Sequence, residues 1–176
     1  EDDEVEDKPA SKELIEALSI LKNNVINSFK IHLAIAGHKS QNLNELLPFG
    51  HSYLGHLNHQ QLAQAFQAAD IFVSPSIEDS GPMMVNQAIM SGTPVVAFEM
   101  GVAIDLVITG QTGYLAKLKD CVDLAKGINN ILVLDDVAYN RLSANCRELG
   151  LKQCHPKVIV ELFTKLFSDT MCPKTR

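Results

Sequence analysis

The residues that could do chemistry gather in one stretch, E-D-S-G-P-M-M-V-N, which runs from Glu78 to Asn86. It follows a short apolar run and leads into an apolar segment of helical character. Ser80 or Gly81 can cap a helix here, and Pro82 suits the first helical position, where the backbone N–H would be unpaired anyway. Free N–H groups at a helix start, with the helix dipole of about +0.5 charge, suit a phosphate. The stretch therefore predicts an anion site.

Two polar side chains flank this predicted anion site, whose N–H groups would come from Gly81, Met83 and Met84. Gly81 would let a ligand approach the backbone closely. Glu78 would repel a phosphate, so we expect it to contact another part of the ligand, such as hydroxyl groups. Asn86 lies about one turn into the helix, and helical side chains lean toward the N-terminus, so its amide can reach the same place. The alternative is that Glu78 only complements the helix dipole and Asn86 faces solvent, and the residue types alone leave both open.

The elements that must hold these residues alternate along the chain. Apolar runs predict strands at residues 31–36, 51–54, 71–74, 94–98 and 114–116. Helical spacing of apolar residues predicts helices at residues 12–26, 58–69, 82–90, 120–134, 136–148 and 156–168. This alternation predicts an α/β fold with a Rossmann-like parallel sheet and helices on both faces. Ligands of such sheets bind beyond the carboxyl ends of the strands, where residues 76–81 fall.

Length and charge describe one domain with polar ends. A chain of 176 residues suits a single core, which we assign to residues 10–170. Residues 1–9 form an acidic leader, expected to be disordered or to mark the edge of a fragment, and residues 171–176 form a tail. Six of the 21 acidic residues lie within Glu1 to Asp7, so the remaining chain carries as many acidic as basic residues. A near-neutral body without a basic stripe argues against nucleic-acid binding.

Other sites and locations can be weighed in the same way. The four cysteines form no C-x-x-C pair and indicate reduced thiols in the cytoplasm. The segment A-G-H-K-S at 36–40 lacks the spacing of a nucleoside-triphosphate loop, and no G-x-G-x-x-G occurs. Scattered histidines and the lack of a D-x-D pair argue against a metal site. The acidic start is unlike a signal peptide, and no apolar run approaches the roughly 20 residues of a membrane span.

Four stretches of the sequence, in this order and spacing, resemble the donor-binding core of family 4 glycosyltransferases, which are retaining enzymes of the GT-B fold. They are A-I-A-G at 34–37, Y-L-G-H-L-N-H-Q-Q-L-A-Q-A-F-Q-A-A-D at 53–70, S-P-S-I-E-D-S-G-P-M-M-V-N-Q-A-I-M-S-G-T-P-V-V-A-F-E-M-G at 74–101, and I-T-G-Q-T-G-Y-L-A at 108–116. The likeness covers roughly residues 30–168 and implies the carboxyl-terminal half of a GT-B enzyme.

The resemblance implies roles for individual residues. Glu78 takes the place of a glutamate that contacts hydroxyls of the donor sugar. Asn86 takes the place of a second glutamate that grips the ribose, and its neutral amide would bind a ribose hydroxyl more weakly than a carboxylate. Residues 80–84 match the backbone that holds the diphosphate and sugar. Gly37 and the stretch Leu54–His56 match the loops around the base and ribose.

The sequence also departs from the family pattern. The family's arginine after its first strand is absent, and Lys8 is the nearer candidate for its lysine, although Pro9 holds the expected place. The first strand, central in this architecture, is missing, because Glu1 to Asp7 cannot form a buried strand. The amino-terminal acceptor domain is missing as well. We therefore expect this chain alone to be inactive.

These implications define an expected function. The full protein would transfer a sugar, as a hexosyltransferase, from a nucleoside-diphosphate sugar to a hydroxyl acceptor, in polysaccharide or glycoconjugate biosynthesis. It would need no metal or other cofactor. We expect it in the cytoplasm, with the inner face of a membrane as an alternative location through peripheral association of the missing half. Two alternative functions stay open: a degenerate, non-catalytic GT-B-like module, and a fold-related sugar-nucleotide epimerase.

Overall fold

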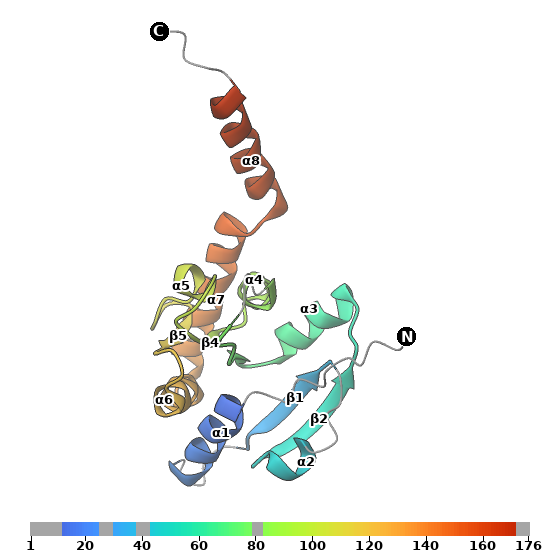
Figure 1. The fold of residues 1–176 in the computed structure, drawn as a ribbon. Coiled ribbons are helices and arrows are strands. Elements are labelled where there is room, and N and C mark those ends of the chain that lie inside the picture. The colour runs from blue at the N-terminus through green and yellow to red at the C-terminus, as the bar shows by residue number, and fades with distance from the viewer. Residues whose placement is uncertain (1–11, 25–29, 38–42, 79–82, 172–176) are drawn as a thin grey trace.

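The computed structural model describes residues 12–24, 30–37, 43–78 and 83–171, and all structural statements concern these residues (Figure 1). The strands are β1 (His32–Ala36), β2 (Gly50–Gly55), β3 (Phe72–Ser74), β4 (Val95–Phe98) and β5 (Gly113–Ala116). The helices are α1 (Lys12–Asn24), α2 (Leu43–Leu46), α3 (His59–Ala68), α4 (Met83–Ser91), α5 (Ala103–Leu106), α6 (Cys121–Leu132), α7 (Asp136–Gln153) and α8 (Pro156–Met171).

The strands form two parallel sheets. One has the order β1-β2, and the other has the order β3-β4-β5. Within the described residues no hydrogen-bonded ladder joins the two sheets. All five expected strands are present and every pair is parallel, so the predicted α/β class with parallel strands is confirmed. The division into two sheets is a feature that the sequence pattern did not predict.

Strand β4 is the centre of the molecule because its four residues are all buried. Side chains alternate between the two faces of a strand. Val96 and Phe98 therefore enter one core cluster, which α1 and α6 cover, while Val95 and Ala97 enter a second cluster. That second cluster contains side chains of α3, α4, α5 and α7. The expected helices on both faces are thus confirmed.

Helix α7 fixes the carboxyl end of α4. Ser143 Oγ donates to the carbonyl oxygen of Gly92 at 2.7 Å, and the Arg147 guanidinium donates to the carbonyl oxygen of Met90. Gly150 lies against Met90 so closely that a β-carbon on Gly150 would be 2.8 Å from Met90 Cα. The close approach holds α4 in place, and with it the residues at its start.

Some element boundaries differ from the sequence expectations. The short helices α2 and α5 were not predicted, because four residues are too few to show a helical period. Helix α7 runs to Gln153 rather than 148. Helix α8 was predicted correctly, but it extends away from the body in Figure 1, and its apolar stripe is exposed.

Candidate functional site

The carboxyl ends of β1 and β2 meet at two glycines. The N–H of Gly37 donates to the carbonyl oxygen of Gly55 at 2.9 Å. Both residues have positive φ, +111° for Gly37 and +68° for Gly55, and a β-carbon at either would meet no atom of the described residues within 4 Å. Backbone therefore borders open space at the carboxyl edge of this sheet, which is where parallel sheets bind ligands.

Leu54 and His56 lie beside these glycines. The register passes from the pair Ile35 and Tyr53 to the pair Ala36 and Gly55, so Leu54 is the extra residue of a β-bulge. Bulges redirect side chains and are frequent next to binding sites. The Leu54 side chain is 40% exposed, and His56 is exposed just after the strand. No local pattern in the sequence predicts this bulge.

Glu78 follows β3 at the carboxyl end of the second sheet. Ser74, the last residue of β3, is buried, and the exposed Glu78 lies four residues further on. The expected residues Ser80, Gly81 and Pro82 lie outside the described residues, and so does Lys8. Their predicted roles, including the cap of the helix, stay predictions.

Helix α4 begins at Met83, close to the position that the sequence predicted. Met83 is 66% exposed and Met84 is 36% exposed, so the helix start borders solvent. The N–H groups of the first residues of a helix have no partner within the helix. The role of the Met83 and Met84 N–H groups toward an anion stays a prediction.

Asn86 carries a buried oxygen without a partner. Its side-chain Oδ1 is inaccessible to solvent, yet it accepts no hydrogen bond from any described residue. The neighbouring Gln87 Oε1 is also buried and likewise accepts no hydrogen bond from any described residue. Leaving a buried acceptor unsatisfied costs roughly 1–3 kcal/mol, so native structures rarely do it. The Asn86 amide oxygen thus lies away from solvent one turn inside α4, while the residue as a whole is half-buried. Its predicted role toward a ligand stays a prediction.

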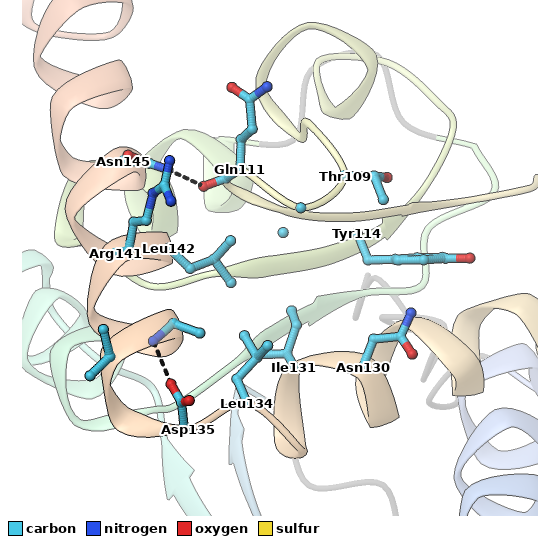
Figure 2. A pocket seen from close by; sticks show the side chains of 14 residues that line it. Thr109, Gln111, Tyr114, Asn130, Ile131, Leu134, Asp135, Arg141, Leu142 and Asn145 are labelled. Carbon is cyan, nitrogen blue, oxygen red and sulfur yellow. Dashed lines mark hydrogen bonds between the residues drawn. The ribbon is translucent and has the colours of Figure 1, made fainter.

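A large cavity of about 890 Å³ lies elsewhere, beside the amino end of β5 (Figure 2). It is bordered by Gly113, by the end of α6 and by the first half of α7. Two of its polar side chains are engaged within the chain: Asn145 donates to the Gln111 carbonyl oxygen at 3.1 Å, and Asp135 accepts from Ala138 N–H at 2.7 Å. Ligands of parallel sheets bind at the opposite, carboxyl edge, so this cavity is not the candidate site despite its size.

Comparison with known proteins defines the class. The sequence profile described as "Glycosyl transferases group 1" matches residues 6–149, well over half of the chain. The chain belongs to this family of glycosyl transferases, and its fold is that of the GT-B carboxyl-terminal domain.

Individual relatives agree with this assignment. The glycogen synthase of Mycobacterium tuberculosis is 35% identical over 86 residues, which are 49% of this chain and 20% of that protein. The structure of sucrose-phosphate synthase from Thermosynechococcus elongatus matches with a TM-score of 0.72 and 25% identity, covering 90% of this chain and 42% of that one. Anabaena HepE in complex with UDP-glucose matches with a TM-score of 0.72 and 20% identity, covering 89% and 44%. The chain thus spans less than half of these proteins.

Neither a metal-binding cluster nor a membrane-spanning helix occurs in the described part of the chain. These residues contain no group of three or more histidine, cysteine, aspartate or glutamate side chains placed to hold a metal ion. Among the same residues, no helix is both long enough and apolar enough to cross a membrane.

Proposed function

We propose that this chain is the donor-binding domain of a retaining glycosyltransferase, which transfers a sugar from a nucleoside-diphosphate sugar to a hydroxyl acceptor in polysaccharide or glycoconjugate biosynthesis. Family membership supports glycosyl transfer. The chain spans only part of its relatives, so the acceptor site is assigned to a second domain in the full protein. We place the enzyme among the hexosyltransferases of the cytoplasm.

The observation that carries the proposal is the unpartnered Asn86 Oδ1 at the start of α4. An amide oxygen at this place can accept a hydrogen bond from a ribose hydroxyl. The exposed backbone at Gly37 and Gly55, at the carboxyl ends of β1 and β2, would give space for the base and ribose. The complex of Anabaena HepE with UDP-glucose supports a uridine or similar nucleotide as the carrier.

The chemistry follows from these placements. The N–H groups at the start of α4, with the helix dipole, would stabilise negative charge as it develops on the departing diphosphate. Glu78, on the loop after β3, would bind hydroxyls of the donor sugar and orient its reacting carbon. This arrangement would require no metal ion, because the backbone N–H groups at the start of α4 would supply the partial positive charge that stabilises the diphosphate. The domain alone would bind donor but lack the acceptor.

The test is calorimetric titration of the full-length protein with UDP-, GDP- and ADP-glucose. Binding of one of them with a micromolar to millimolar dissociation constant is the expected result. Absence of heat with all three would overturn the proposal.

A degenerate module that only binds other proteins is the second candidate. The neutral Asn86 in place of a glutamate favours it, because the bond to ribose would lack the assistance of charge. Absence of heat with all three sugar nucleotides in the full-length protein would select this candidate.

A further inference from the structure

The cavity beside the amino end of β5 is large enough for a small-molecule ligand (Figure 2). Its volume of about 890 Å³ lies within the range of roughly 300–1,000 Å³ that small-molecule sites have. Gly113, which borders it, is the first residue of β5, so the cavity lies at the amino edge of the β3-β4-β5 sheet. The proposed donor site lies beyond the carboxyl ends of the strands. The cavity is therefore a separate site.

Hydrogen bonds hold two walls of this cavity together. The turn before β5 forms one wall, and the first half of α7 forms another. Asn145 of α7 donates to the Gln111 carbonyl oxygen at 3.1 Å. The thiol of Cys146, the next residue of α7, donates to the Thr112 carbonyl oxygen at 3.1 Å. Because both bonds fix α7 to the turn, the cavity is preformed, as small-molecule sites usually are.

The interior of the cavity is apolar. Ile131 at the end of α6 and Leu142 of α7 are buried in its floor, and Leu134 is exposed at its opening. Figure 2 shows these three side chains lying together between α6 and α7. Water beside apolar side chains is favourably displaced by an apolar group of a ligand. The interior therefore favours a ligand with an apolar body, such as a ring system.

One unpaired cation lines the cavity. It is Arg141 of α7, the only basic residue among the described residues of the lining. Its guanidinium group makes no hydrogen bond or ion pair with any described residue. A guanidinium group carries a fork of N–H donors that matches the two oxygens of a carboxylate. Arg141 therefore favours an anionic group on the ligand.

An acidic side chain limits how much negative charge the cavity accepts. Asp135 lines the same cavity, and its carboxylate accepts a hydrogen bond from Ala138 N–H as the cap of α7. A phosphate monoester carries about −1.5 to −2 charges, which exceeds what one guanidinium group can balance next to an aspartate. A carboxylate carries a single negative charge. The pair of Arg141 and Asp135 therefore favours a monocarboxylate over a phosphate.

We propose that this cavity binds a small organic monocarboxylate with an apolar body. The carboxylate would pair with Arg141, and the body would lie against Ile131, Leu134 and Leu142. This site does not depend on the proposed donor site, which lies at the opposite edge of the strands.

Ligand-observed NMR titration of the full-length protein tests the proposal with three probes of similar shape. They are 2-naphthoate, the neutral 2-naphthalenemethanol and 2-naphthyl phosphate. The naphthoate should bind with a dissociation constant of about 1 mM or lower. The alcohol should bind about tenfold more weakly, because it lacks charge-assisted hydrogen bonds. The phosphate should bind no more tightly than the naphthoate, and saturating UDP should leave all three affinities unchanged.

Three variants locate the probe in the cavity. Arg141→Gln should weaken binding of the naphthoate about tenfold and leave binding of the alcohol unchanged. Lys152→Gln is the matched control, since it removes the same charge from an exposed residue of α7 outside the cavity, and it should change neither affinity. Ala138→Leu places a larger side chain in the lining and should weaken both probes. Thermal unfolding followed by circular dichroism shows that each variant is folded.

Several results would overturn the proposal. Equal affinities for the naphthoate and the alcohol would remove the role of the guanidinium group, and so would equal losses in Arg141→Gln and Lys152→Gln. Tighter binding of the phosphate would contradict a site for a monocarboxylate. Displacement of the naphthoate by UDP would place the probe in the donor site instead. A failed titration with sugar nucleotides changes none of these expected results, so the two proposals can fail separately.

Discussion

Gly150 of α7 and Met90 of α4 are in backbone contact: a β-carbon on Gly150 would lie 2.8 Å from Met90 Cα and 2.9 Å from Met90 N. Neither of these atoms can move without moving α4. The contact ties the position of α4, and thus of the candidate site at its start, to a helix far along the chain.

Gly150→Ala should therefore destabilise the protein, even though alanine favours helix more than glycine does. Overpacking of this kind costs about 1–3 kcal/mol, which corresponds to a fall of roughly 2–10 °C in melting temperature for a domain of this size. Thermal unfolding followed by circular dichroism measures it. The control is Asn140→Ala, an exposed position of the same helix, which should change stability by about 0.5 kcal/mol or less. Equal effects of the two variants would contradict the tight contact.

Glu78→Ala should weaken binding of a sugar nucleotide more than binding of the bare nucleotide, because the carboxylate is assigned to the sugar hydroxyls. Loss of hydrogen bonds to a charged group is worth about 1.5–3 kcal/mol, or roughly tenfold to a hundredfold in dissociation constant. Titration with UDP-glucose and with UDP measures the two losses in the full-length protein. If both ligands lose the same affinity, Glu78 does not contact the sugar.

Asn86→Glu should tighten nucleotide binding, because a carboxylate accepts a stronger hydrogen bond from ribose than an amide does. We expect about a tenfold lower dissociation constant for UDP. Gln87→Glu is the matched control, since it introduces the same charge at the adjacent residue, whose oxygen is also buried and unpartnered. A gain in both variants would point to a general effect of charge rather than to ribose.

Alkaline solution should destabilise the fold in two steps. Burial raises the pKa of the Cys146 thiol from 9.0 to about 12. Burial and the hydrogen bond to Asp123 raise the pKa of Tyr114 from 10.0 to about 12. Both groups keep their protons longer in the folded chain, so their stabilisation is complete below pH 9 and is lost as the pH rises toward 12.

Denaturant unfolding measured at a series of alkaline pH values follows this loss, because each group begins to lose its contribution at its ordinary pKa, 9.0 for the thiol and 10.0 for the phenol. Cys146→Ala should flatten the decrease in unfolding free energy between pH 9 and 10. Tyr114→Phe should flatten it only above pH 10. Unchanged slopes in both variants would mean that other groups control alkaline stability.

Most of the fold could be predicted from the sequence, because the spacing of apolar residues along a helix or strand follows from which of its side chains are buried. Strand β4 is a continuous apolar run and helix α6 shows a helical period, and both lie where expected. The division of the described strands into two sheets could not be predicted, because strand pairing depends on contacts between distant segments. The short helix α5 was missed for lack of a full period.

Only part of the candidate site could be predicted from the sequence. Helix α4 begins close to the expected residue, because Pro82 and the apolar residues after it punctuate the sequence. The bulge at Leu54 and the contact between Gly37 and Gly55 had no local signal, since both arise from pairing of separate strands. The buried oxygen of Gln87 was also missed, because helical spacing alone does not tell which polar side chain is enclosed. Ser80, Gly81, Pro82 and Lys8 stay predictions.

Helix α8 carries Val160, Leu162, Phe163, Leu166 and Phe167 with more than half of each side chain in water. A purified sample of this chain should consequently self-associate as its concentration rises, with light scattering increasing before any loss of helix content. A mild non-ionic detergent should reverse the effect. For binding assays on a surface, the chain is therefore better attached through its amino end and at low density, so that α8 helices of neighbouring molecules do not meet.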